Sequence, residues 1–158
     1  MGVAGVAGIR GTVTVLYTFV VRADDPLRSL SLGDVELFRL AAELLRDRGR
    51  PGKHSVAAAV RAGSSVYLGL DLMSRKSPIC AEPAAISAAN SAGDYDLDAI
   101  VAVCFRGELS APVSISPCGA CRELVSFHAP ECRVLFEYEG RLVDVKAREL
   151  FPYPVIFG

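Results

Sequence analysis

The chain has 158 residues, and its 17 basic and 18 acidic side chains give a formal net charge of −1. Without a strong charge of either sign, the sequence carries no electrostatic signal for nucleic acid or an anionic membrane as a partner. Hydrophobic residues make up 51% of the chain, enough for one core and some apolar area between subunits, but no apolar run approaches the roughly 18 residues of a membrane span.

The beginning of the chain and the cysteine count both bear on the compartment. No basic region precedes the apolar N-terminal stretch, and Arg10 interrupts it, so we expect no secretion signal. Five cysteines in such a chain are typical of a reducing compartment, where clustered thiols bind metals or act in catalysis more often than they form disulfides. We therefore expect a cytoplasmic protein.

The first predicted elements are a strand and a helix. Residues 12–21 are rich in β-branched and aromatic side chains and predict an extra strand within an N-terminal extension, residues 1–28. Residues 29–49 predict a helix, in which Ser31 and Asp34 resemble a capping box. Its apolar stripe consists of Val35, Phe38, Ala42 and Leu45.

Strands and helices then alternate. Residues 55–60 and 66–72 predict a hairpin, followed by a helix over 80–92 and a nearly continuous apolar strand over 97–105. The pattern continues with a second helix, a strand that turns into another, and a short last helix, at 118–128, 132–140, 141–145 and 146–151. This alternation predicts a single α/β domain, residues 1–158, built in layers on a mixed sheet.

Three cysteines are expected at helix starts. Cys118 and Cys121 are separated by two residues, a spacing that lets both sulfurs face one ion, and Cys80 can supply a third ligand. Helix N-termini carry partial positive charge, which stabilises thiolates. Three protein ligands leave one tetrahedral position for water, as in catalytic zinc sites, so we predict Zn²⁺ as the cofactor.

A carboxylate accompanies the thiols. Glu82 follows Cys80 by two residues and can reach the same pocket without binding the metal. Zinc lowers the pKa of a bound water to roughly 7–9, and a neighbouring carboxylate can then accept its proton. Two other interpretations stay open: the Cys-x-x-Cys pair alone suits a redox site, and Cys104 or Cys132 could complete a structural four-cysteine zinc site. The redox interpretation leaves Glu82 unexplained, and both additional cysteines are typical of core positions.

The motifs carry a family resemblance. Cys80-Ala81-Glu82 and Pro117-Cys118-Gly119-Ala120-Cys121 match the pattern of zinc nucleobase deaminases, in which the glutamate is the general acid/base. From about residue 54 onward the chain resembles the cytidine deaminase superfamily, in its three-cysteine, homotetrameric branch. The ten residues between Gly69 and Cys80, and the closing REL-F-P segment, resemble the blasticidin-S deaminases of that branch. The resemblance implies a three-layer α/β/α fold with a five-stranded mixed sheet.

The resemblance also implies roles for individual residues. Glu82 would be the catalytic proton carrier. Asp71 and Met73 stand where cytidine deaminases place the asparagine and glutamate that hold the ribose hydroxyls. The backbone around Ala81 and Ser116 would orient the amidine edge of the base. The expected substrate contacts are Ser55, Asp71, Met73, Ala81, Ser116 and Phe157, the last in a tail that can close a neighbouring subunit's site.

We therefore expect a zinc-dependent hydrolytic deaminase that converts the amino group of a cytosine-type nucleoside or analogue to a carbonyl and releases ammonia. Met73 in place of an acid, and Arg75 and Lys76 in the nearby loop, favour an alternative substrate: a blasticidin-S-like nucleoside antibiotic or an anionic nucleotide. An inactive binding scaffold is the non-enzyme alternative, although Glu82 is present. The expected partners are a small nucleoside-type molecule and three further copies of the chain, not nucleic acid or membrane.

Overall fold

The computed structural model describes residues 31–106 and 111–154. The predicted N-terminal extension, with its strand at 12–21, and Phe157 lie outside these residues. The described elements are, in order, α1 (Leu32–Arg48), β1 (Val56–Ala62), β2 (Ser65–Leu70), α2 (Ala81–Ala92), β3 (Ala99–Arg106), β4 (Ala111–Ser114), α3 (Gly119–His128), β5 (Arg133–Tyr138), β6 (Arg141–Lys146) and α4 (Ala147–Leu150). None of the described helices combines the length and the apolar character that crossing a membrane requires.

The strands form one mixed sheet. Five of them follow the order β2-β1-β3-β5-β6, in which β3 and β5 run parallel and the other neighbours antiparallel. The predicted five-stranded mixed sheet is thus confirmed. A sixth strand was not predicted: the short β4 pairs with the second half of β3, beyond the point where β5 pairs with its first half. Four residues that include Pro112 give too little pattern for a strand to be recognised.

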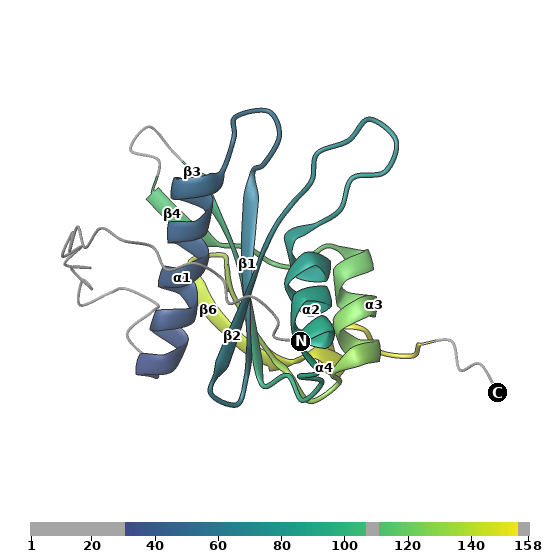
Figure 1. The fold of residues 1–158 in the computed structure, drawn as a ribbon. Coiled ribbons are helices and arrows are strands. Elements are labelled where there is room, and N and C mark those ends of the chain that lie inside the picture. The colour runs from purple at the N-terminus through teal and green to yellow at the C-terminus, as the bar shows by residue number, and fades with distance from the viewer. Residues whose placement is uncertain (1–30, 107–110, 155–158) are drawn as a thin grey trace, which may run out of the picture.

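Helices cover both faces of this sheet, which confirms the three-layer α/β/α architecture. Figure 1 shows α1 on one side and α2, α3 and α4 on the other. The strand residues alternate accordingly: on β3, Val101 and Val103 face α1, whereas Ile100 and Ala102 face the other helices. Because β1 and β3 are covered on both faces, they are almost wholly apolar, as predicted for the strand at 97–105.

The α1 layer is built from large side chains. Ser31 caps the helix as predicted, since its hydroxyl accepts a hydrogen bond from the Asp34 amide. The buried stripe differs slightly from the predicted one, because Leu37 and Ala41 are buried and Val35 only partly so. It consists of Asp34, Leu37, Phe38, Ala41, Ala42 and Leu45.

Asp34 anchors this layer. Its side chain is 1% exposed and pairs with two arginines of the sheet, Arg61 on β1 at 3.2 Å and Arg133 on β5 at 3.0 Å. Each arginine also bonds a second, more exposed aspartate: Arg61 bonds Asp98, and Arg133 bonds Asp144. A buried carboxylate that is paired on both sides fixes the first turn of α1 against the sheet.

The contact of α2 with the sheet is built from small side chains. Ala81, Ala85 and Ala89 are each fully buried and lie on the face of α2 that packs on β1 and β2. The strand residues beneath are small as well, among them Ala58 and Gly69. The alanine-rich sequence of this helix therefore permits a close approach between helix and sheet.

Candidate active site and metal centre

Three cysteines meet where the first turns of α2 and α3 converge. Cys80 is the N-cap residue of α2, Cys118 is the N-cap residue of α3, and Cys121 lies one turn into α3. Their sulfur atoms all lie within 4.8 Å of one another, and the Sγ atoms of Cys80 and Cys118 are 3.7 Å apart. In a tetrahedral site with Zn–S bonds of ~2.3 Å, neighbouring sulfurs are about 3.8 Å apart, so the cluster has the dimensions that zinc requires.

The electrostatics of the cluster also favour a cation. Burial works against the Cys118 thiolate, but hydrogen bonds from Cys121, Cys80 and the Ala120 amide outweigh it and lower the pKa of Cys118. Burial raises the pKa of Cys80 and of Cys121, and the neighbouring Glu82 carboxylate raises both further. Three thiolates would repel one another here, and a divalent cation at their centre compensates that repulsion.

Glu82 lies in the same first turn of α2. Its side chain is 6% exposed, and burial, reinforced by the charge of Asp71, raises the pKa of its carboxyl group. Among the described residues no lysine or arginine forms an ion pair with it. A buried carboxyl group with a raised pKa holds a proton more readily than an exposed one, which suits a general acid/base.

Arg122 braces the loop before α3. Its guanidinium donates one hydrogen bond to the carbonyl oxygen of Pro117 at 2.9 Å and another to the hydroxyl of Ser116 at 2.9 Å. These contacts hold the two residues that precede Cys118. The sequence predicted Ser116 near the base, and the structure places it in this braced loop beside the cysteines.

Two predicted substrate contacts bind each other. The Asp71 carboxylate, 5% exposed, accepts hydrogen bonds from the Ser55 amide at 2.7 Å, the Ser55 hydroxyl at 2.8 Å and the Val56 amide at 3.1 Å. The structure thus brings these two predicted residues together at the start of β1. Met73, in contrast, is 55% exposed on the loop that follows β2.

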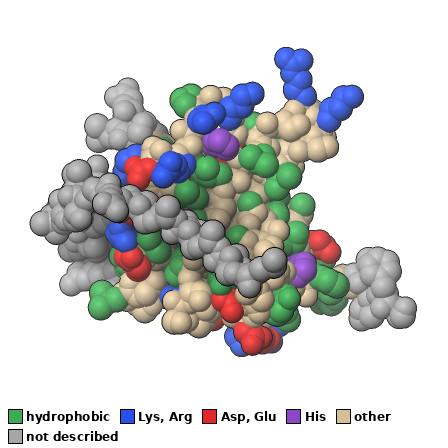
Figure 2. Space-filling view, viewed as in Figure 1, with side chains coloured by type: hydrophobic (Ala, Val, Ile, Leu, Met, Phe, Trp, Pro, Cys, Tyr) green, Lys and Arg blue, Asp and Glu red, His purple; other side chains and the backbone are tan. Residues whose placement is uncertain are grey.

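Three cationic residues lie on this loop or on the loop that is hydrogen-bonded to it. Arg75 and Lys76 are exposed near the tip of this loop. A bridge between Leu72 and Ile79 closes its base. Lys53 belongs to the preceding loop, and its carbonyl oxygen accepts a hydrogen bond from the Met73 amide at 3.0 Å. Figure 2 shows Lys and Arg side chains projecting where Figure 1 places the loop between β2 and α2. Sequence reasoning missed Lys53, because only the pairing of the two strands brings it here.

The remaining cysteines and histidines stand apart from the cluster. Within the described residues, the metal-ligand cluster contains three side chains and no fourth. Cys132 is buried in the core and Cys104 is partly buried on β3, so neither completes a four-cysteine site. His54 accepts a hydrogen bond from the Arg50 amide, and His128 is the last residue of α3.

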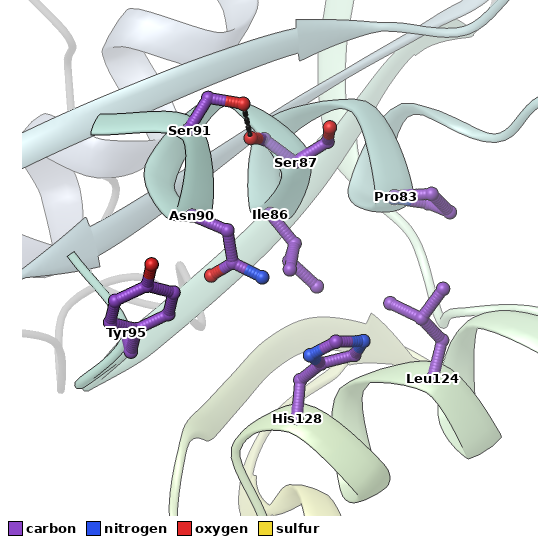
Figure 3. A pocket seen from close by; sticks show the side chains of 8 residues that line it. All are labelled: Pro83, Ile86, Ser87, Asn90, Ser91, Tyr95, Leu124 and His128. Carbon is purple, nitrogen blue, oxygen red and sulfur yellow. Dashed lines mark hydrogen bonds between the residues drawn. The ribbon is translucent and has the colours of Figure 1, made fainter. Parts of the chain in front are cut away.

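A groove runs between the outer sides of α2 and α3. Figure 3 shows its lining residues on both helices and on the segment that follows α2. Its volume is about 420 Å³, and two aromatic side chains at or near it are largely exposed, Tyr95 at 66% and Phe127 at 78%. The lining residues are Pro83, Ile86, Ser87, Asn90, Ser91, Tyr95, Leu124 and His128.

Comparison with known proteins identifies the family. Residues 33–135 match the family model of the cytidine and deoxycytidylate deaminase zinc-binding region. The blasticidin-S deaminase of Bacillus cereus is 37% identical over 130 residues, which cover 78% of this chain and 93% of that protein. The chain belongs to this zinc-binding deaminase family. It is therefore a hydrolytic deaminase, and the three thiols fit Zn²⁺ as its cofactor.

Solved structures agree with the fold of the deaminase. The cytidine deaminase of Bacillus anthracis superposes with a TM-score of 0.65 at 22% identity, over 77% of this chain and 88% of that one. The cytidine deaminase of Burkholderia pseudomallei superposes with a TM-score of 0.63 at 23% identity, over 80% of this chain and 100% of that one. Both comparisons show that this chain shares its three-layer fold with these structures.

Proposed function

We propose that this deaminase hydrolyses the amino group of a cytosine-type nucleoside or a close analogue, with release of ammonia. The observation that carries the proposal is the buried Glu82 carboxyl group beside three thiols of zinc-site dimensions. The 37% identity to a blasticidin-S deaminase and the structural likeness to cytidine deaminases support the same chemistry. Cys80, Cys118 and Cys121 would hold the zinc ion, which when bound supplies a water acidic enough to act as a nucleophile near neutral pH.

Glu82 then transfers the protons of the reaction. Its carboxylate accepts one proton from the attacking water and passes it to ring nitrogen N3 while the water oxygen bonds to C4. A second proton, from the new hydroxyl group, goes through the same carboxyl group to the amino nitrogen. The C4–N bond breaks, ammonia leaves, and a carbonyl remains. Burial of Glu82 excludes bulk water, which would otherwise compete for these protons.

Other residues would orient the substrate. The loop that Arg122 braces presents the backbone of Ser116, and α2 presents that of Ala81, to the amidine edge of the base. On the sugar side, Asp71 is held by Ser55, and Met73 offers no carboxylate for a hydroxyl group. A hydrogen bond lost at such a position costs about 1–3 kcal/mol, so ordinary ribose would be bound weakly there.

A specific observation favours a second candidate, a cytosine nucleoside or nucleotide that carries an acidic group. In the part of the chain that the structure describes, Lys53, Arg75 and Lys76 form no ion pair, and they lie on two loops that are hydrogen-bonded to each other. One of these loops leads directly into Cys80. A carboxylate or phosphate on the sugar portion would find three cations there.

The test is a screen for ammonia release with zinc-loaded protein. The panel contains cytidine, deoxycytidine, their phosphates, cytosine nucleosides with an acidic sugar, blasticidin S and adenosine as an aminopurine. We expect turnover of at least one cytosine-type compound, and a higher kcat/KM for the acidic members identifies the second candidate. Absence of ammonia from every member would mean that the protein does not deaminate cytosine-type compounds.

We also infer a homotetramer that works in the cytoplasm. The exposed Tyr95 and Phe127 beside the α2–α3 groove offer apolar surface that a further copy of the chain can bury. The five free thiols suit a reducing compartment. Light scattering after gel filtration should give four times the chain mass of 16.8 kDa, and a monomer mass at micromolar concentration would contradict the assembly.

A further inference from the structure

A row of very small residues crosses the sheet beneath α2. Gly69 on β2 pairs with Ala58 on β1, and Ala58 pairs with Ala102 on β3. The Ala102 carbonyl oxygen in turn accepts a hydrogen bond from the Ile115 amide at 2.9 Å, at the start of the loop that leads to Cys118. One row across the sheet therefore supports α2 at one end and the approach to α3 at the other.

At Gly69 the sheet and α2 approach each other too closely for a side chain. A Cβ atom at this position would lie 2.4 Å from the Ala85 amide nitrogen, 2.6 Å from the Ala81 carbonyl oxygen and 2.8 Å from the Ala84 Cβ. Two of these three atoms belong to the helix backbone, which cannot rotate away as the end of a side chain can. Any side chain at position 69 therefore requires the strand and the helix backbone to move apart, by about 1 Å to reach ordinary contact distances.

Hydrogen bonds tie the end of β2 to β1. Just beyond Gly69, the Asp71 carboxylate binds the Ser55 and Val56 amides, and the Asp71 amide donates to the Val56 carbonyl oxygen at 3.1 Å. These bonds fix the end of β2 to β1. A contact between position 69 and α2 would therefore push the helix away from a strand end that these bonds hold on β1.

The first turn of α2 carries Cys80 and Glu82, whereas Cys118 and Cys121 belong to α3. A shift of α2 alone therefore changes the distances between the two halves of the cluster. Metal–ligand distances tolerate deviations of only about 0.2 Å, and a misplacement of about 1 Å in a catalytic group can cost a hundredfold in rate. We propose that Gly69 is a positioning residue, which sets the place of Cys80 and Glu82 opposite the two cysteines of α3 because it has no side chain.

The experiment compares Gly69→Ala with two control variants. Gly119→Ala adds the same methyl group in the first turn of α3, between two of the cysteines, where nothing lies within 4 Å of the new atom. Val101→Ala removes buried volume from the α1 face of the sheet and lowers stability without touching α2. The first readout is the zinc retained against a competing chelator, with folding followed by circular dichroism.

We expect Gly69→Ala to fold and to retain zinc at least tenfold less tightly than the unmodified chain, whereas both controls keep it within twofold. A role in stability alone would make Val101→Ala lose zinc in proportion to its unfolding, and it would leave Gly69→Ala normal once folded. Zinc retention in Gly69→Ala equal to that in Gly119→Ala would overturn the proposal. Should Gly69→Ala not fold, Ala84→Val enlarges the same contact from the helix side and must show the same loss.

A kinetic readout extends the test, and it rests on the proposed deaminase reaction. With an active substrate, kcat of zinc-saturated Gly69→Ala should fall at least tenfold while KM changes less than threefold, because Glu82 moves and the loops around the pocket do not. An unchanged kcat would contradict the inference about Glu82. The chelator measurement needs no substrate, so failure to find one would affect the proposed function and leave the positioning inference decided by zinc retention.

Discussion

The two faces of the sheet are stabilised in different ways. On the α1 face, Leu37, Phe38 and other large side chains fill the space, and a buried carboxylate, Asp34, is paired with two arginines. On the other face, where α2 approaches β1 and β2, alanines pack on alanine and glycine, and the buried carboxyl group of Glu82 has no cationic partner among the described residues.

The α1 layer therefore contributes mainly to stability, and the α2 layer carries the groups that do the chemistry. Paired charges and large apolar side chains stabilise the α1 layer, whereas the α2 layer keeps a buried carboxyl group without a cationic partner among the described residues and three clustered thiols, a set that a bound cation would stabilise. The small side chains let two helix starts approach the sheet and each other. We expect changes on the α2 face to alter metal binding and turnover, and changes on the α1 face to alter the free energy of unfolding.

The largest effect should follow loss of a thiol on the α2 face. Cys118→Ala removes the thiol with the lowered pKa, and we expect zinc content to fall from about one ion per chain to well below half, with no detectable deamination. Metal analysis and an ammonia assay measure both. Cys104→Ala is the matched control, because this cysteine lies outside the cluster and should keep zinc and turnover. Full zinc content in Cys118→Ala would exclude the three-thiol site.

Glu82→Gln comes next, because it keeps the shape of the side chain and removes the proton carrier. We expect kcat to fall by about 10²–10⁴ with zinc content unchanged. The control is Glu123→Gln, an exposed glutamate of α3 that should keep its full rate. Steady-state kinetics on the same zinc-loaded preparations measure kcat. A kcat for Glu82→Gln near that of the unmodified chain would assign the proton transfer to another group.

On the α1 face, Asp34→Asn should act on stability instead. Removing the charge leaves Arg61 and Arg133 without their shared buried partner, at a cost of about 3 kcal/mol in the free energy of unfolding. Glu36→Gln, which breaks an exposed pair with Arg39 in the same helix, should cost about 0.5 kcal/mol at most. Urea unfolding measures both, and kcat per folded molecule should stay unchanged in each.

The same carboxylate predicts a pH dependence. Burial opposes ionisation of Asp34, but hydrogen bonds from Arg133 and Ser31 and the charges of Arg133 and Arg61 outweigh it and lower its pKa below the ordinary value of 3.8. The unfolded chain therefore binds the proton first as the pH falls. The stabilisation is complete above about pH 5 and is lost progressively on further acidification, down through the lowered folded-state pKa. In Asp34→Asn the free energy of unfolding should fall less steeply at acidic pH. An unchanged pH dependence would contradict the assignment of this effect to Asp34.

The smallest effect is expected in the loop beside the metal centre. Arg75→Ala combined with Lys76→Ala should raise KM for an acidic cytosine nucleoside about tenfold at low salt and leave KM for cytidine nearly unchanged. The free energy of unfolding should change by less than about 0.5 kcal/mol, since both side chains are exposed. Arg141→Ala, an exposed residue at the start of β6, is the control. Equal changes for both substrates would remove the case for an anionic substrate.

Much of the site could be predicted from short segments of sequence. Cysteines at helix starts, a glutamate two residues after one of them, and the capping of α1 by Ser31 each depend on neighbours within one turn. Local spacing fixes local geometry, because a residue's position in a helix determines where its side chain points. The short β4 and the exact membership of the α1 stripe escaped this reasoning, since a few residues give too weak a pattern.

The sequence by itself determined the chemistry of this protein: three thiols, one acid, and the alternation of helices and strands that carries them. Only the tertiary structure decided which distant residues meet. It places Cys80 3.7 Å from Cys118, joins Asp34 to Arg133 across the sheet, hydrogen-bonds Met73 to Lys53, and puts Gly69 directly beneath α2. The physical reason is that strand pairing uses the same backbone groups in every residue, so register and close approach depend on how the whole layer packs.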